Sequence, residues 1–281
     1  MSKLNKEEKS WILYDWANSA YSMTITSTIL PIYFKMVAEQ GGMKSLTSTA
    51  LWGYTISIST FIVAMLAPVL GNIADYKGNK KRLFNIFLII GLLSTLFLVF
   101  VPENAPILLL IIYTFSTVGF CGANIFYDAF LVDITKDERM DYISSMGYGM
   151  GYIGSTIPFI FCIIVVLLSQ KEILSISVGM AFKITFVITA LWWGVFTIPL
   201  LKNVNQKYYV EKEKNIFKNS FKDLIKTLKK IKNDKPVLIF LIAYFFYIDG
   251  VHTIIGMATS YGTDLGISMT SLLIILLLTQ F

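Results

Sequence analysis

Long uncharged runs separated by short polar connectors dominate the pattern of this chain. Thirty consecutive uncharged residues lie between Lys44 and Asp75, and 29 lie between Asp141 and Lys171. Because about 20 apolar residues cross the hydrocarbon core of a membrane as a helix, these runs predict membrane-spanning helices. We expect spans at 11–37, 51–74, 83–101, 106–130, 142–168, 182–201 and 237–260, with an eighth starting near residue 270.

The connectors carry the positive charges unequally. If the N-terminus lies in the cytoplasm, the cytoplasmic segments hold 20 of the 24 Lys and Arg residues. The other four are Lys35, Lys44, Lys171 and Lys183. Since cytoplasmic loops carry the excess of Lys and Arg, we expect a multi-pass protein of the plasma membrane with its N-terminus in the cytoplasm.

The longest connector, residues 202–235, holds 11 lysines and four acidic residues, which leaves a charge of −1 for the rest of a chain of net charge +6. It divides a six-span unit, 1–201, from the start of a second unit, 236–281. Apolar residues recur in it at helical spacing among lysines: Phe217, Phe221, Leu224, Leu228 and Ile231. This pattern predicts an amphipathic helix on the anionic inner leaflet, with a partner-binding surface as the alternative.

Composition narrows the function classes. Apolar residues make up 55% and charged residues 15% of the chain, whereas soluble domains have about 45–50% and 25%. The basic charge is confined to one connector, so nucleic-acid binding is not expected. Cys121 and Cys162 lie inside apolar runs and the chain has one histidine, so we expect no disulfide framework, no metal site and no cofactor.

The connector after the second predicted span has a distinctive motif. An acid, a turn glycine and a cationic cluster follow one another from Gly71 through Asp75 and Gly78 to Lys80. This spacing predicts a tight turn between helices, in which Asp75 caps and faces the positive N-terminal end of a neighbouring helix. The alternative is an ordinary positive-inside loop with a glycine turn.

Polar residues recur at helical spacing in three spans. The first span has Asp15, Asn18, Ser22 and Thr26, and the fourth has Thr117, Cys121, Asn124 and Asp128. The seventh has Asp249, His252 and Gly256. Ionisable residues within a span mark substrate or proton pathways, and the alternatives are interfacial capping and hydrogen bonds between helices. For Asp249 and His252 we expect a proton-responsive site, with a hydrogen-bonded packing pair as the alternative.

The fifth predicted span carries small residues along one face. Gly147, Gly151 and Gly154 recur there, followed by Pro158. Small residues let helix backbones approach closely in lipid, so this face predicts helix packing. A hinge for a rocking motion is the alternative.

Together these motifs resemble a known transporter superfamily. The connector matches the major facilitator signature G-x-L-A-D-x-x-G-x-K at Gly71, Ala74, Asp75, Gly78 and Lys80, with Ile73, Tyr76 and Asn79 departing from it. The stretches 14–21, 126–131, 145–149, 249–250 and 257–262 are similar to its vacuole-effluxer-like branch, which includes fungal vacuolar amino-acid exporters. The resemblance implies twelve helices in two halves, with helices 1, 4 and 7 lining a central cavity. On that basis the chain ends within helix 8 and is truncated.

The function expected from these features is secondary active transport. A small polar solute, with amino acids as candidates, would cross by alternating access in a proton-coupled symporter or antiporter. Two other classes stay open: a membrane receptor or assembly protein, and an intramembrane enzyme. The enzyme is disfavoured because the chain has no G-x-G-D, H-E-x-x-H or G-x-S-x-G motif. A primary pump is not expected, because the chain has no Walker A loop.

Overall fold

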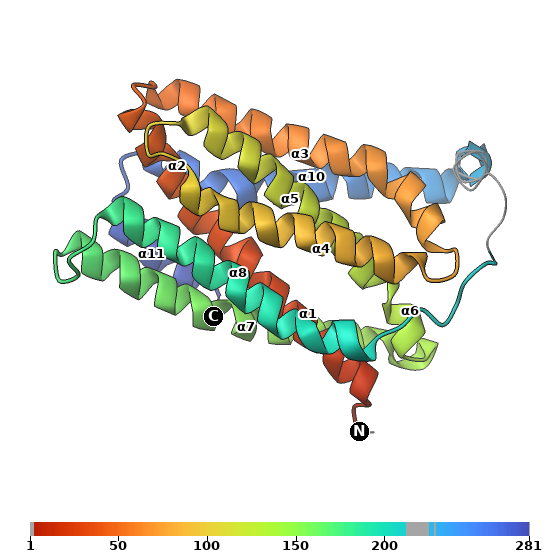
Figure 1. Cartoon of the computed structure of the whole chain (residues 1–281). Helices are drawn as coiled ribbons and strands as arrows, with labels where there is room; N and C mark the ends of the chain where they lie inside the picture. Colours follow the sequence, from red (N-terminus) through yellow and green to blue (C-terminus); the bar gives the residue numbers. More distant parts are fainter. Residues whose placement is uncertain (1–2, 212–224, 228, 281) are drawn as a thin grey trace.

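A computed structural model describes residues 3–211, 225–227 and 229–280, and shows long helices running alternately in opposite directions (Figure 1). This part of the chain is an all-α bundle, and it contains six helices long and apolar enough to cross a membrane. These six helices confirm the six predicted spans from 51–74 to 237–260. The elements are α3 (Ser45–Ala74), α4 (Asn79–Phe97) with η2 (Leu98–Phe100), α5 (Pro106–Ala129), α6 (Leu131–Ile134), η3 (Asp137–Arg139), α7 (Met140–Gln170), α8 (Val178–Asn203), α10 (Lys235–Asp264) and α11 (Met269–Leu278).

The first span is not the uniform helix that we expected at 11–37. It consists of α1 (Lys6–Tyr21), a π-helical segment η1 (Ser22–Thr28) and α2 (Ile29–Gln40). Pro31 has no N–H and leaves the carbonyl four residues earlier, at Ser27, without a helical donor. The Thr259 hydroxyl of α10 donates to that carbonyl instead. A contact between distant segments therefore compensates for the irregular helix.

Local sequence explains where several helices begin. Asn5 caps α1: its side chain accepts from the backbone N–H of Glu8 at 2.7 Å, and the Glu8 carboxylate accepts from the Asn5 N–H at 2.9 Å. This is a capping box. Pro106 stands at the start of α5, where no N–H is needed. Ser177 caps α8 and Asp234 caps α10 through their side-chain oxygens.

The two ends of the bundle differ in charge. One end, here called the basic end, holds residues 3–10, 75–82, 129–140 and 202–211, which Figure 1 shows together at the end that carries the N-terminus. Hydrogen bonds join them, for example from Asn203 to Ser10 at 2.9 Å. Most of the predicted amphipathic segment, 212–224 and 228, lies outside the described residues.

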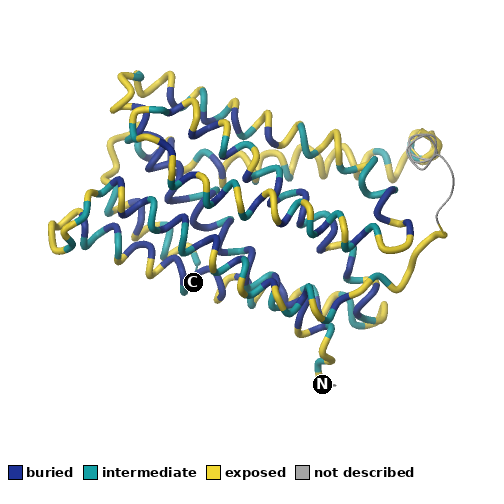
Figure 2. Tube along the Cα trace, viewed as in Figure 1, coloured by how far each residue is buried: buried dark blue, intermediate teal, exposed yellow. Residues whose placement is uncertain are grey.

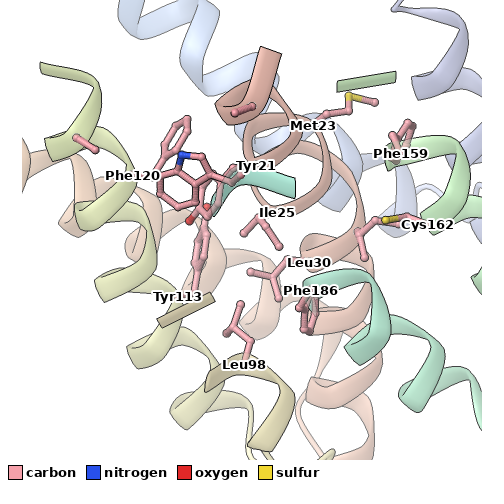
Figure 3. Packing of buried hydrophobic residues seen from close by; sticks show 14 of the residues in the cluster. Tyr21, Met23, Ile25, Leu30, Leu98, Tyr113, Phe120, Phe159, Cys162 and Phe186 are labelled. Atoms are coloured by element: carbon pink, nitrogen blue, oxygen red, sulfur yellow. The ribbon is translucent and has the colours of Figure 1, made fainter. Parts of the chain in front are cut away.

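The buried core lies where the first span crosses α5 and α8. Tyr21 stacks on Phe120 with ring centroids 4.3 Å apart and contacts Trp193 at 5.4 Å. Figure 3 shows this packing around Tyr21 and Ile25, and Figure 2 shows that α10 is mostly exposed. Aromatic pairs contribute about 0.5–1.5 kcal/mol beyond the area that they bury. Since lipid provides no hydrophobic force between helices, such packing holds the bundle together.

Candidate functional site

A cavity of about 640 Å³ lies between the first span, α7, α10 and α11. Its polar wall is made of hydroxyl, phenol, imidazole and amide groups: Ser19, Ser22, Ser27, Ser155, Thr279, Tyr148, Tyr152, His252 and Gln280. None of the residues that line it, within the described part of the chain, is Asp, Glu, Lys or Arg. The cavity therefore offers hydrogen-bonding groups without a fixed charge.

The predicted polar faces of the first and fourth spans meet beside this cavity. The Asn18 amide donates to the Asn124 side-chain oxygen at 2.9 Å, and the Tyr14 hydroxyl donates to the same oxygen at 3.3 Å. Further along, the Tyr21 hydroxyl lies 3.4 Å from the Thr117 hydroxyl. These hydrogen bonds join α1 to α5, which is the alternative that the sequence left open for these polar residues. Thr26 lies in the π-helical segment η1 and is close to Tyr113 of α5.

Asp15 of α1 is half-buried and Asp128 of α5 is exposed, and both lie toward the basic end of the bundle. Asp128 lies close enough to act electrostatically on Asp15, and Tyr148, which lines the cavity, is within range of both carboxyl groups. Neither aspartate forms an ion pair with a residue that the structure describes.

The glycine face of α7 lies directly against α1. A Cβ atom on Gly147 would lie 2.7 Å from a carboxylate oxygen of Asp15, and one on Gly151 would lie 2.6 Å from the Ser19 hydroxyl. At Gly154 the atom in the way is the backbone oxygen of Trp16, at 2.4 Å. These glycines therefore permit the close approach that puts Asp15 and Ser19 beside the cavity.

Asp249 and His252 are both exposed on α10, one turn apart. His252 lines the cavity, whereas Asp249 does not. No hydrogen bond joins Asp249 to His252 or to another residue in the described ranges. Gly256, the third member of the predicted polar face, is buried and accepts a hydrogen bond from the Trp52 indole at 3.0 Å.

The predicted signature connector forms a tight turn at the basic end. Gly78 has φ +75°, the left-handed region that favours glycine, and its N–H donates to Gln206 at 3.0 Å. Gly71 lies in the last turn of α3, where its carbonyl accepts from the Asp75 N–H at 3.3 Å. Lys80 is buried at the start of α4.

The predicted capping role of Asp75 is wrong. Gly78 is the N-cap of α4, and no side-chain oxygen accepts a hydrogen bond there. Asn79 instead donates its side-chain N–H to the Ile73 carbonyl at 3.0 Å. Asp75 is exposed, since the φ of Gly78 turns the chain before the Asp75 carboxylate reaches the helix. Partial desolvation raises the pKa of Asp75 above its ordinary value, and the charge of Lys80 opposes that shift.

Sequence reasoning missed the partner of Lys80. Its ammonium group lies 2.7 Å from Asp133, both side chains are almost fully buried, and it also donates to the Ala129 carbonyl at 2.9 Å. The other oxygen of Asp133 accepts from the backbone N–H groups of Lys207 and Tyr208 at 2.8 and 2.9 Å. Asp133 therefore joins α4, α6 and the segment after α8. The signal in the sequence that could have identified Asp133 is an acidic residue soon after an apolar span.

A second buried acid, Glu8, was also missed. Besides its capping contact, it accepts from the Thr135 hydroxyl at 2.8 Å and pairs with Arg139 at 3.1 Å. Segment 204–211 adds backbone contacts with the signature connector: the Val210 N–H donates to the Asp75 carbonyl at 2.8 Å, and the Lys77 N–H donates to the Val210 carbonyl at 3.0 Å. The basic end is thus closely bound across the first six spans.

The chain is similar in sequence to a family of known proteins. The chain matches the family described as "Vacuole effluxer Atg22 like" over residues 44–141 and 132–281. An uncharacterized MFS-type transporter of Bacillus subtilis, YxiO, is 55% identical over 280 residues, which cover 100% of this chain and 65% of that protein. Autophagy-related protein 22-1 of Emericella nidulans is 22% identical over 370 aligned residues, covering 91% of this chain and 62% of that protein.

A solved structure has a similar fold. The crystal structure of a D-xylose-proton symporter matches 98% of this chain and 65% of its own length, with a TM-score of 0.61 and 13% sequence identity. At this identity the likeness shows the fold alone. The chain spans less than two thirds of the length of each of these three proteins.

Proposed function

The chain belongs to the vacuole effluxer Atg22-like family of multi-pass membrane proteins, and we propose that it works as a secondary active transporter. In this proposal a small polar solute crosses the membrane by alternating access between the two helical units, 1–201 and 236–281. Segment 202–235 connects them and lies on the anionic inner leaflet through its lysines.

The observation that carries the proposal is the cavity between the first span, α7, α10 and α11. This cavity of about 640 Å³ is lined by apolar side chains together with nine polar ones, and polar groups inside a membrane need water, a solute or one another as hydrogen-bond partners. A water-filled solute pathway explains why hydroxyl groups line it. The uncharged wall suits a solute without net charge, and zwitterionic amino acids are the candidates implied by the family resemblance.

Proton coupling is proposed for the acidic groups beside this cavity. In this proposal Asp15 and Asp128, which lack an ion-pair partner among the described residues, exchange a proton or bind a cation at the basic end. His252 contributes an imidazole to the cavity wall, and Asp249 lies one turn before it. In this proposal Asn18 and Asn124 contact the solute pathway, and the connector from Gly71 to Lys80 changes partners as the protein switches state.

The orientation is part of the proposal. The basic end carries the connectors in which Lys and Arg are concentrated, so it is placed in the cytoplasm. The plasma membrane is the proposed location.

Flux measurements in liposomes test the function. Radiolabelled neutral amino acids are assayed for exchange at equal pH and for net flux under a pH gradient, with wild type compared to His252→Gln and Asp249→Asn. Loss of net flux with exchange preserved supports a coupling role. If the folded full-length protein binds solute but supports neither exchange nor net flux, it is a receptor rather than a transporter.

A further inference from the structure

An ion pair between a buried lysine and a partly exposed aspartate joins the first span to α10 at the end of the bundle opposite the basic end. The Lys35 ammonium lies 2.6 Å from Asp264, and the two side chains are 8% and 25% exposed. The Ser45 hydroxyl donates to the same carboxylate oxygen at 2.5 Å, and the Thr49 hydroxyl donates to the other oxygen. Lys35 also donates to the Ser45 carbonyl at 3.2 Å. Helices α2, α3 and α10 therefore converge on one carboxylate.

This ion pair lies at the end of the short stretch of α10 that packs against the first six spans. The buried residues of α10 all lie in its last third: Gly256, Thr259, Ser260 and Gly262. Two hydrogen bonds hold this part, from Trp52 to the Gly256 carbonyl and from Thr259 to the Ser27 carbonyl. The preceding residues, 235–255, are exposed or half-buried (Figure 2). The described part of α10 thus packs on the first six spans only near the opposite end.

We propose that the Lys35–Asp264 ion pair is the closing contact of a gate at this end, and that separating the two side chains opens the cavity there. The inference rests on the proposed function only in treating this opening as a step of alternating access. The gate joins the unit 1–201 to the unit 236–281, whereas the contacts of the basic end described above lie within 1–211.

The physical reason is a difference in hydration between the two states. When the gate is closed, Lys35 is withdrawn from water and depends on Asp264 for its counter-charge. When the gate opens, water solvates both groups and the pair is no longer needed. Removing Asp264 therefore penalises the closed state alone and shifts the population toward the open one.

The two partners are not equivalent. Asp264→Asn leaves a charged lysine buried beside a neutral amide, so it disfavours closure strongly. Lys35→Met leaves a carboxylate that is already a quarter exposed and that keeps its hydrogen bonds from Ser45 and Thr49. The expected order of gate opening is therefore Asp264→Asn, then Lys35→Met, then wild type.

The reporter is a cysteine at Ser260, one turn before Asp264. Ser260 is 1% exposed and its hydroxyl has no hydrogen-bond partner among the described residues, so Ser260→Cys disturbs little. The native cysteines are replaced by Cys121→Ala and Cys162→Ala. The 281-residue chain is reconstituted in liposomes, and the rate of labelling by a membrane-impermeant maleimide added from the opposite end is measured.

We expect Asp264→Asn to raise this rate at least tenfold and Lys35→Met to raise it less. The charge exchange Lys35→Asp with Asp264→Lys should return the rate toward that of wild type. Lys183→Met is the matched control, because Lys183 lies at the same end but faces Glu103, at 4.0 Å, within the first six spans. This control should leave the rate unchanged.

An unchanged labelling rate in Asp264→Asn, with the protein monodisperse in detergent, overturns the proposal. So does an equal increase in Lys183→Met, since the effect would then be a general loosening of that end. Labelling requires no solute movement, so absence of flux would count against the transporter proposal without affecting this result.

Discussion

Replacing Gly154 by alanine should separate the two helices that hold Asp15 beside the cavity. A Cβ atom at Gly154 would lie 2.4 Å from the Trp16 carbonyl oxygen and 2.7 Å from the Trp16 Cα. Both atoms belong to the backbone of α1, so no side-chain rotation relieves the overlap. Ordinary contacts begin at 3.4 Å, and α1 and α7 must therefore move apart by about 1 Å.

The magnitude follows from two opposing effects. Inserting a methyl group into a close-packed contact costs about 1–3 kcal/mol. Alanine also favours the helix over glycine by about 1 kcal/mol, which partly hides that cost. Gly149→Ala removes this ambiguity, because Gly149 lies on the same helix and a Cβ there meets nothing within 4 Å. The difference between the two variants isolates the steric cost, about 1–3 kcal/mol.

Gly147→Ala should fall between them. The atoms in its way are the end of the Asp15 carboxylate, at 2.7 Å, which can rotate, and the Trp11 ring, at 2.9 Å. That ring is buried and hydrogen-bonded to the Tyr127 carbonyl, so it can shift only slightly. Melting temperatures in one detergent, read by fluorescence-detected size exclusion, should rank Gly149→Ala highest, then Gly147→Ala, then Gly154→Ala. Equal melting temperatures for Gly149→Ala and Gly154→Ala would refute the packing argument and favour the hinge interpretation of this face.

Three further predictions concern the basic end. Asp133→Asn leaves Lys80 charged and buried, so it should lower the free energy of unfolding by about 3–5 kcal/mol and lower the melting temperature. Lys80→Met should lower it less, because Asp133 keeps two backbone donors. Gly78→Val should cost about 1–2 kcal/mol from its positive φ alone, since a Cβ there meets no other atom, and an equal effect of Gly71→Ala would contradict this reason. Reporter fusions should place Lys80 in the cytoplasm and Asn104 outside, and the reverse pattern would overturn the orientation.

Much of the fold could be predicted from charge spacing alone. Uncharged runs such as 45–74 exceed the membrane thickness, so span bounds follow from the cost of burying charge in lipid. The turn at Gly78 was predicted from the local motif, because that motif places a glycine where the chain must reverse direction between two spans. Helical spacing placed Asn18 and Asn124 on polar faces of two spans, but their hydrogen bond to each other was not predicted.

The errors arose where a residue has several possible partners. Asp75 lies within reach of a helix start by sequence count, yet the backbone turn at Gly78 leaves it exposed. The π-helical segment could not be predicted either. Pro31 shows that the Ser27 carbonyl loses its helical donor, but only the position of Thr259, 232 residues further along, shows which donor replaces it.

The sequence by itself determined the class of protein, the number and bounds of most spans, and which connectors carry the positive charge. These properties depend on the length and composition of each segment, because a segment enters the lipid according to its own residues. Only the tertiary structure decided that Lys80 pairs with Asp133 and Lys35 with Asp264, and that Gly154 lies against the backbone of α1. Ion pairs and close contacts act over a few ångströms between residues remote in sequence, so the arrangement of the helices has to be known before their partners can be named.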